Sequence, residues 1–348
     1  MNEGGNSLAK LKQYPAIDIA KYVAAMLVVA IHTFPFVDFN PAFNLFFIST
    51  IGRLAVPFFF VCSSFFLFRK VNQVHLRSIQ AKEIMKKWFV RIGVLYLIWT
   101  VIYLPYTIWN YAQAGFSLSG LLGWIRDFFL NGSYYHLWFL PALMLGMAIV
   151  WWLYTKKGVI FTLEVSLILY FIGYLINIFG PIWESLPYIS IVYGFFVKMI
   201  VTARDGFFFA PLFIGIGLMC SQMRRPNLKA CSMGFAASFI GLILEVCVYS
   251  ALGVLSDQSS MFLMLIPALY FFMNMMLQIK MPKKAVYVKM RQESTLIYVS
   301  HILFARLLLL VIPEYHLVVY LVTLALAQFF ASTVLRLSDK YPWLNWLM

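Results

Sequence analysis

The hydrophobic positions of this chain form long continuous runs that are separated by short polar segments. A helix needs about 20 mostly apolar residues to cross the hydrocarbon layer of a bilayer, and the runs here reach that length. Strands of a membrane barrel would instead alternate apolar and polar residues. The pattern predicts ten transmembrane helices, at residues 16–36, 45–68, 89–109, 136–155, 159–179, 204–222, 231–252, 259–279, 293–312 and 316–336. The stretch 181–200, which contains Pro181 and Pro187, is predicted to be an outer loop or an interfacial segment.

The composition excludes a soluble or a disordered protein. The chain has 348 residues, of which 63% are hydrophobic and 11% charged, and its mean hydropathy is +0.84. Soluble domains are about 45–50% apolar and about 25% charged. We therefore predict an all-α, polytopic integral membrane protein. The first run is long enough to span and lacks a cleavage site, so no signal peptide is expected. The four cysteines lack the spacing of metal ligands, so they are expected to be buried, and no metal site is predicted.

The basic residues are distributed unequally between the two sides of the predicted bundle. Alternate connections contain 21 Lys and Arg on one side and 2, Arg126 and Lys198, on the other. Because these residues accumulate in cytoplasmic loops, both termini are predicted to be cytoplasmic. The net charge of +14 then needs no nucleic-acid partner, and membrane lipids are the expected surroundings. The predicted organisation is a cytoplasmic segment (1–15), a ten-helix membrane domain (16–336) and a cytoplasmic tail (337–348).

The first predicted span carries three polar side chains, Asp18, Lys21 and His32. A charge in the middle of a membrane helix costs at least ~2.5–3.5 kcal/mol, so it indicates either a function or a structural pair. Lys21 and His32 share a face within about 20° and lie about 16 Å apart along a helix. Asp18 is one turn from Lys21, and an ion pair between them near the inner interface is the structural alternative.

Polar groups also recur near the outer ends of four different spans. They are His32, Arg53, His136 and Arg204. Their similar predicted depth indicates a polar cavity that opens outward. Trp138 lies beside His136, and an aromatic belt at the interface is the alternative explanation for it and for Tyr134 and Tyr135. His301 lies nearer the middle of the ninth span, and Arg306 is on a different face of that helix.

Five short motifs together resemble those of the acyltransferase family 3 membrane O-acyltransferases. They are Asp18-Ile-Ala-Lys21 with His32, Arg53-Leu-Ala-Val-Pro57, Tyr135-His-Leu-Trp-Phe-Leu-Pro141, Ala203-Arg-Asp-Gly-Phe-Phe-Phe209 and Ile297-Tyr-Val-Ser-His301. The similarity runs over nearly the whole chain and includes the ten-helix arrangement. Two features depart from the commonest version of the family. The basic residue of the first motif is Lys21, at a position where Arg is also frequent in the family. No extracellular hydrolase-like domain follows the last span.

The resemblance implies transfer of an acyl group, usually acetyl, from cytoplasmic acyl-CoA to a hydroxyl on an extracytoplasmic glycan or lipid-linked sugar. The expected location is the bacterial plasma membrane. His32 is the candidate general base, and Arg53 is the candidate group that stabilises the oxyanion. The candidate substrate-binding residues are Lys21, Asp18, His136, Trp138, Arg204 and His301. Acetyl-CoA is expected as a co-substrate, with no permanently bound cofactor. Peptidoglycan, teichoic acid and capsule all offer such hydroxyls.

A second function remains open at this point. The same ten-helix domain resembles the membrane half of VanT-type serine racemases, where the family association is with delivery of L-serine. In that case Arg53 or Arg204 would hold a carboxylate. No racemase domain is expected, because too little chain follows Arg336. A homo-oligomer is compatible with either function.

Overall fold

The computed structural model describes residues 13–348. The N-terminal segment with Lys10 and Lys12, except for its last residues, lies outside the described residues. In the described part, every element is a helix. The α-helices are α1 (Pro15–Thr33), α2 (Pro41–Thr50), α3 (Ala55–Val71), α4 (Ile79–Ala114), α5 (Leu118–Leu130), α6 (Phe139–Ile178), α7 (Gly180–Ser185), α8 (Ile189–Ile200), α9 (Ala210–Gln222), α10 (Leu228–Ala251), α11 (Leu265–Met276), α12 (Ala285–Val311) and α13 (His316–Ser338). Two 3₁₀ helices, η1 (Gly52–Leu54) and η2 (Pro342–Leu347), complete the set.

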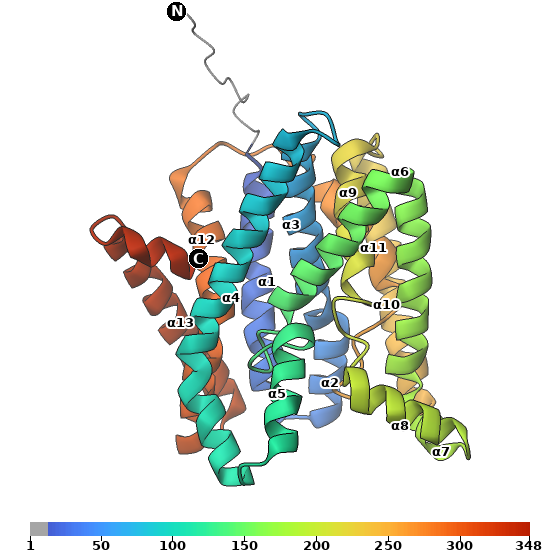
Figure 1. Cartoon of the computed structure of the whole chain (residues 1–348), viewed down its shortest axis with the longest axis vertical. Coiled ribbons are helices and arrows are strands. Elements are labelled where there is room, and N and C mark those ends of the chain that lie inside the picture. The colour runs from blue at the N-terminus through green and yellow to red at the C-terminus, as the bar shows by residue number, and fades with distance from the viewer. Residues whose placement is uncertain (1–12) are drawn as a thin grey trace, which may run out of the picture.

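The predicted all-α membrane fold is confirmed. Seven helical stretches of the described chain are long and apolar enough to cross a membrane, among them the continuous α2–η1–α3 segment, Pro41–Val71. The fourth and fifth predicted spans both lie within α6, which is interrupted at Gly158 (φ 81°). Figure 1 shows both arms of α6 extending from this turn toward the lower end of the bundle. The helices α9 and α11 are shorter, with 13 and 12 residues. The total of ten crossings and the orientation stay predictions.

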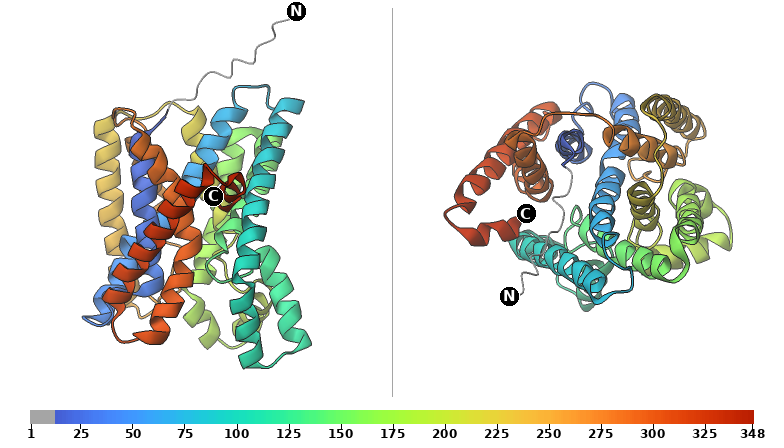
Figure 2. Two further views of the ribbon diagram at one scale, coloured as in Figure 1. Left: turned by 90° about the vertical axis from the view of Figure 1, so that its left-hand side faces the viewer. Right: turned by 90° about the horizontal axis from the view of Figure 1, so that it is seen from above.

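The connections rich in Lys and Arg lie together at one end of the bundle. Figure 1 shows the α3–α4, α9–α10 and α11–α12 connections, with the turn of α6, at the upper end. The helices α5, α7 and α8 lie at the opposite end. In the view from above in Figure 2, α1 lies among the other helices, and α13 forms one side of the bundle. The charge asymmetry in the sequence therefore corresponds to the two ends of one bundle.

Small residues allow α9 to pack closely between α3 and α6. A Cβ atom at Gly217 of α9 would overlap Ser64 and the backbone of Val61 on α3. A Cβ atom at Gly146 of α6 would lie 2.7 Å from the Cβ of Ala210. Close approach of backbones at small residues is the common way in which membrane helices associate. It fixes the position of α9, and with it the segment that precedes α9.

The stretch 181–200 folds into α7 and α8, and no residue of α8 is buried. Its apolar side chains are exposed, with Ile191 and Val192 each 71% accessible. The helix α5 was not predicted as an element. It also has no buried residue, and Leu118 at its start is 73% accessible. Both helices lie at the end of the bundle that the charge count assigns to the outside (Figure 1).

The four cysteines are all free thiols. Cys62, Cys220 and Cys231 are buried, as expected for small apolar side chains. Cys247 is exposed on α10, which differs from the expectation. It lies on a helix of which few residues face the protein interior, so the side chain is turned away from the bundle.

The close approach at Gly217 gives a stability prediction. Gly217→Ala should destabilise the protein by about 1–3 kcal/mol, because the added methyl group meets backbone atoms that cannot move aside easily. The matched control is Gly194→Ala on α8, where nothing lies within 4 Å of an added Cβ. Thermal unfolding in detergent should show a lowered Tm for the first variant and an unchanged or raised Tm for the second. Equal Tm values for the two variants would contradict this account of the α3–α9 contact.

Candidate functional site

Four of the predicted site residues meet around a small buried space, which we call the deep pocket. His32, Arg53, Arg204 and Trp138 line it, and its volume is about 30 Å³. His32 comes from the last turn of α1, and Arg53 comes from η1 between α2 and α3. Arg204 precedes α9, and Trp138 is the N-cap residue of α6. The structure thus brings together side chains from four segments that are far apart in the sequence.

Both arginines are held by backbone and aromatic contacts and not by ion pairs with carboxylates. The Arg53 guanidinium donates to the backbone oxygen of Asp257. The carboxylate of Asp205 accepts from Phe207 N at 2.8 Å and from Phe208 N at 2.7 Å, and this tight turn fixes the adjacent Arg204. The Arg204 guanidinium lies 5.0 Å from the centre of the Trp138 ring, which is a cation–π distance.

Neither Arg53 nor Arg204 forms an ion pair within the described part of the chain, and the Asp257 carboxylate attracts both guanidinium groups from beyond ion-pair distance. The Nε atoms of both are buried and make no hydrogen bond within the described residues. Because a guanidinium stays charged, a buried one requires an anion or polar oxygens nearby. The deep pocket therefore suits an oxygen that carries negative charge.

Three imidazole rings form a cluster beside the deep pocket. The ring centre of His301 on α12 lies 5.3 Å from that of His32 and 5.4 Å from that of His136. His136 and His301 are buried, whereas His32 faces the pocket. The hydroxyl of Tyr298 donates to the His136 backbone oxygen at 2.6 Å, which ties the segment before α6 to α12. His136 and His301 thus lie behind His32 and outside the lining of either cavity.

A larger space, the outer cavity, adjoins the deep pocket. Its volume is about 660 Å³, and Trp138 and Arg204 line both spaces. Ligand pockets commonly measure ~300–1,000 Å³, so the outer cavity is large enough for a whole ligand. Aromatic rings and side-chain amides both contribute to its walls. Examples are Tyr111, Trp124, Tyr193, Asn110, Asn177 and Gln258.

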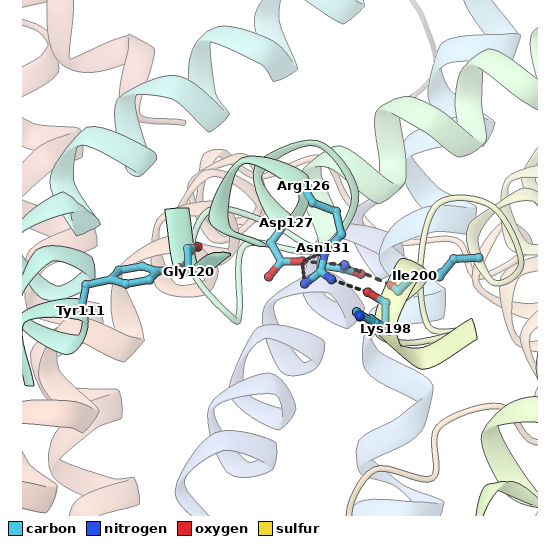
Figure 3. A network of polar contacts seen from close by, with 7 residues as sticks. All are labelled: Tyr111, Gly120, Arg126, Asp127, Asn131, Lys198 and Ile200. Atoms are coloured by element: carbon cyan, nitrogen blue, oxygen red, sulfur yellow. Dashed lines mark hydrogen bonds and ion pairs between the residues drawn. The ribbon is translucent and has the colours of Figure 1, made fainter. Parts of the chain in front are cut away.

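One wall of the outer cavity consists of α5 and α8, joined by the polar contacts in Figure 3. Arg126 donates to Lys198 O at 2.6 Å and pairs with Asp127 at 2.9 Å. Asn131 donates to Ile200 O at 3.1 Å. The carbonyl groups that accept these bonds belong to the last turn of α8, where an α-helix has no acceptors for them of its own. The two basic residues assigned to the outside, Arg126 and Lys198, are both part of this contact.

Tyr135 is a site residue whose position the sequence interpretation missed. Its ring packs edge-on against His32 with centres 5.2 Å apart, and the Arg306 guanidinium lies 5.2 Å from the Tyr135 ring centre. Both residues line the outer cavity. An aromatic belt was the alternative for Tyr135, and Arg306 was not connected with the site. Since the two residues come from different segments, no spacing within one helix could have paired them.

Lys21 and Asp18 lie at the other end of α1 and are not part of this cluster. The ion pair of Asp18 is with Arg291 on α12, at 3.8 Å, and not with Lys21. The alternative of an ion pair between Asp18 and Lys21 is therefore wrong, because Asp18 pairs with a different residue. The ion-pair partner of Asp18 comes from a neighbouring helix, and only the packing of α1 against α12 shows which residue it is. In the described residues, no group of three or more His, Cys, Asp or Glu is arranged to hold a metal ion.

Comparison with known proteins gives one family and several relatives. Residues 14–337 match the acyltransferase domain family. An amino-acid racemase of Enterococcus faecalis is 30% identical over 278 residues, which cover 78% of this chain and 37% of the racemase. A serine/alanine racemase of Enterococcus gallinarum is 29% identical over 269 residues, which cover 75% of this chain and 37% of the racemase. The chain thus spans less than half the length of these relatives. No solved structure shows a significant match.

Proposed function

Because the chain belongs to the acyltransferase family whose domain matches residues 14–337, we propose that it is an O-acyltransferase of the bacterial plasma membrane. The donor is acyl-CoA on the cytoplasmic side, with acetyl-CoA as the expected form. The acceptor is a hydroxyl of an extracytoplasmic glycan or lipid-linked sugar. The acyl group passes from the thioester sulfur to the acceptor oxygen.

One observation carries this proposal. The imidazole of His32 and the guanidinium groups of Arg53 and Arg204, which form no ion pair within the described residues, meet around one small space. A volume of about 30 Å³ is enough for one water molecule, which needs at least ~10–15 Å³ of such space. It therefore fits a single oxygen and not an entire sugar or amino acid. Acyl transfer needs a base for the hydroxyl and cationic or hydrogen-bonding groups at the developing oxyanion. His32, Arg53 and Arg204 provide these groups.

The proposed reaction uses the side chains of His32, Arg53 and Arg204. The acceptor lies in the outer cavity with its hydroxyl directed at His32, which removes the proton as the new C–O bond forms. Arg53 and Arg204 stabilise the negative oxygen of the tetrahedral intermediate. The C–S bond then breaks, and the sulfur of CoA receives the proton from His32. One acyl ester and one thiol form, and His32 returns to its neutral state.

The donor would approach from the opposite end of α1. The basic connections cluster at that end (Figure 1), and cationic side chains there suit the phosphates of CoA. Lys21 lies on the α1 face that also carries His32, about 16 Å away along the helix. We propose that the pantetheine arm follows this face, with Lys21 and Asp18 near its entry.

A second candidate is an amino-acid transport module, and the names of the relatives favour it. In this case Arg53 and Arg204 would hold the carboxylate of the amino acid, and the outer cavity would be its binding space. The match of residues 14–337 to the acyltransferase domain family argues against transport as the first choice, since that match covers nearly the whole described chain. We therefore place transport second.

Transport and transfer can be separated in one reconstituted system. Purified protein in liposomes should convert labelled acetyl-CoA in the presence of glycan acceptors isolated from the cell envelope. Labelled L-serine, offered to the same liposomes without acetyl-CoA, should not accumulate above the level in protein-free liposomes. Accumulation of serine without turnover of acetyl-CoA would reverse the order of the two functions.

The role of His32 predicts a selective loss of activity. His32→Ala should lower acetyl transfer by at least about 10²-fold, because general base catalysis contributes ~10²–10⁴-fold. Its Tm should remain close to that of the wild type. His316→Gln is the matched control, since His316 contacts Asp38 at the start of α13 and does not line either cavity. Retained product formation by His32→Ala would remove the imidazole from the mechanism.

Arg53→Lys tests the oxyanion role. A lysine ammonium cannot keep both the contact with Asp257 O and a second donor directed into the pocket. The kcat for acetyl transfer should fall about 10²–10³-fold, which is the usual effect of losing one oxyanion donor. The KM for acetyl-CoA should change little. A variant with wild-type kcat would make Arg53 a purely structural residue.

A further inference from the structure

In two imidazoles of the cluster, those of His136 and His301, backbone carbonyl groups determine which ring nitrogen carries the proton. His301 Nδ1 lies 2.7 Å from Tyr298 O and 3.1 Å from Ile297 O. His136 Nε2 lies 3.3 Å from Val299 O. A carbonyl oxygen only accepts, so in the neutral rings these nitrogens carry the hydrogen. The remaining nitrogens, His301 Nε2 and His136 Nδ1, are therefore acceptors.

Both acceptor nitrogens are buried and have no hydrogen-bond partner within the described residues. Leaving a buried acceptor without a donor costs about 1–3 kcal/mol. Two neighbouring hydroxyl groups already donate elsewhere. Tyr298 donates to His136 O, and Tyr103 donates to Val299 O. The ring of His32 lies beside His301, with its centre 5.3 Å away, and either of its nitrogens can carry a proton and donate it.

We propose that His301 positions His32 by accepting an N–H bond at its Nε2 atom. The bond would form by a small rotation of the His32 ring or through one water, because catalytic hydrogen bonds often tighten only when substrate binds. With one ring nitrogen of His32 engaged in this way, the other nitrogen is left without a proton and faces the deep pocket. His301 is thus a positioning residue that selects the tautomer of the base. This inference rests on the proposed function of His32.

An imidazole suits this role better than a carboxylate at this depth. In Ser-His-Asp sites, a carboxylate orients the base. Here the described residues place no carboxylate in an ion pair with any of the three imidazoles. A carboxylate inside the membrane would be costly, and it would compete for the guanidinium groups of Arg53 and Arg204. A neutral acceptor orients His32 and leaves both arginines available for the oxyanion.

Two substitutions of His301 separate orientation from packing. In His301→Asn, the amide nitrogen can still donate to Tyr298 O, but the acceptor at the Nε2 position is lost. In His301→Gln, the longer side chain carries its amide oxygen to about that position and can accept from His32. We expect Asn to lower kcat by about tenfold or more and Gln to remain within about threefold of the wild type. The KM for acetyl-CoA should be unchanged in both.

Equal losses of kcat in the two variants would overturn the inference, because packing alone would then explain them. Wild-type kcat in His301→Asn would overturn it as well. Both kinetic outcomes presuppose acyl transfer by the wild type, so a second readout is needed that does not depend on activity.

Nitrogen NMR of histidine-labelled full-length protein in liposomes provides this readout. The chain has five histidines, so single variants suffice to assign the signals. His301 should show a protonated Nδ1, and the His32 ring signals should move in His301→Asn but not in His301→Gln. Unchanged His32 signals in both variants would overturn the inference even if acyl transfer is confirmed. If the wild type transfers no acyl group but the His32 signals respond as expected, the proposed function fails while the His32–His301 bond stands.

Discussion

The structure depends on the cost of burying charged side chains that form no ion pair in a membrane protein. Arg53 is 6% accessible, and its guanidinium has no carboxylate partner within the described chain. Such a side chain is tolerated only where polar atoms or water surround it. The protein meets this demand with a backbone carbonyl, an aromatic face and a small cavity, all at one end of the bundle.

Irregular backbone at the site serves the same purpose. Non-helical backbone inside a membrane protein is tolerated where it is buried in protein or lines a cavity. The segments before α6, before α9 and between α10 and α11 break their helices beside the deep pocket. Their polar groups are used there: Asp257 O holds Arg53, and Asp205 fixes the turn at Arg204. The regular helices α1, α3, α9 and α12 provide the rigid frame around them.

The sequence predicted the fold class and the residues of the deep pocket. Long apolar runs are a strong signal, and a polar side chain within such a run is conspicuous, so His32, Arg53 and Arg204 could be found. The helix at residues 118–130 was missed because it is too short for a span, although Ser117 caps it and its apolar residues recur at helical spacing. The contact of Tyr135 with His32 and the pair of Asp18 with Arg291 were missed for another reason. Both join distant segments, and a single sequence contains no information on their distance.

The wall formed by α5 and α8 has a consequence for how a ligand reaches and leaves the outer cavity. No residue of either helix is buried, and hydrogen bonds to Lys198 O and Ile200 O join α5 and the residue after it to the last turn of α8. Each such bond contributes about 0.5–1.5 kcal/mol. Opening the wall by local fluctuation therefore costs far less than separating α3 from α9. Movement of α5 and α8 would therefore change the width of the outer cavity while the arginines and imidazoles keep their geometry.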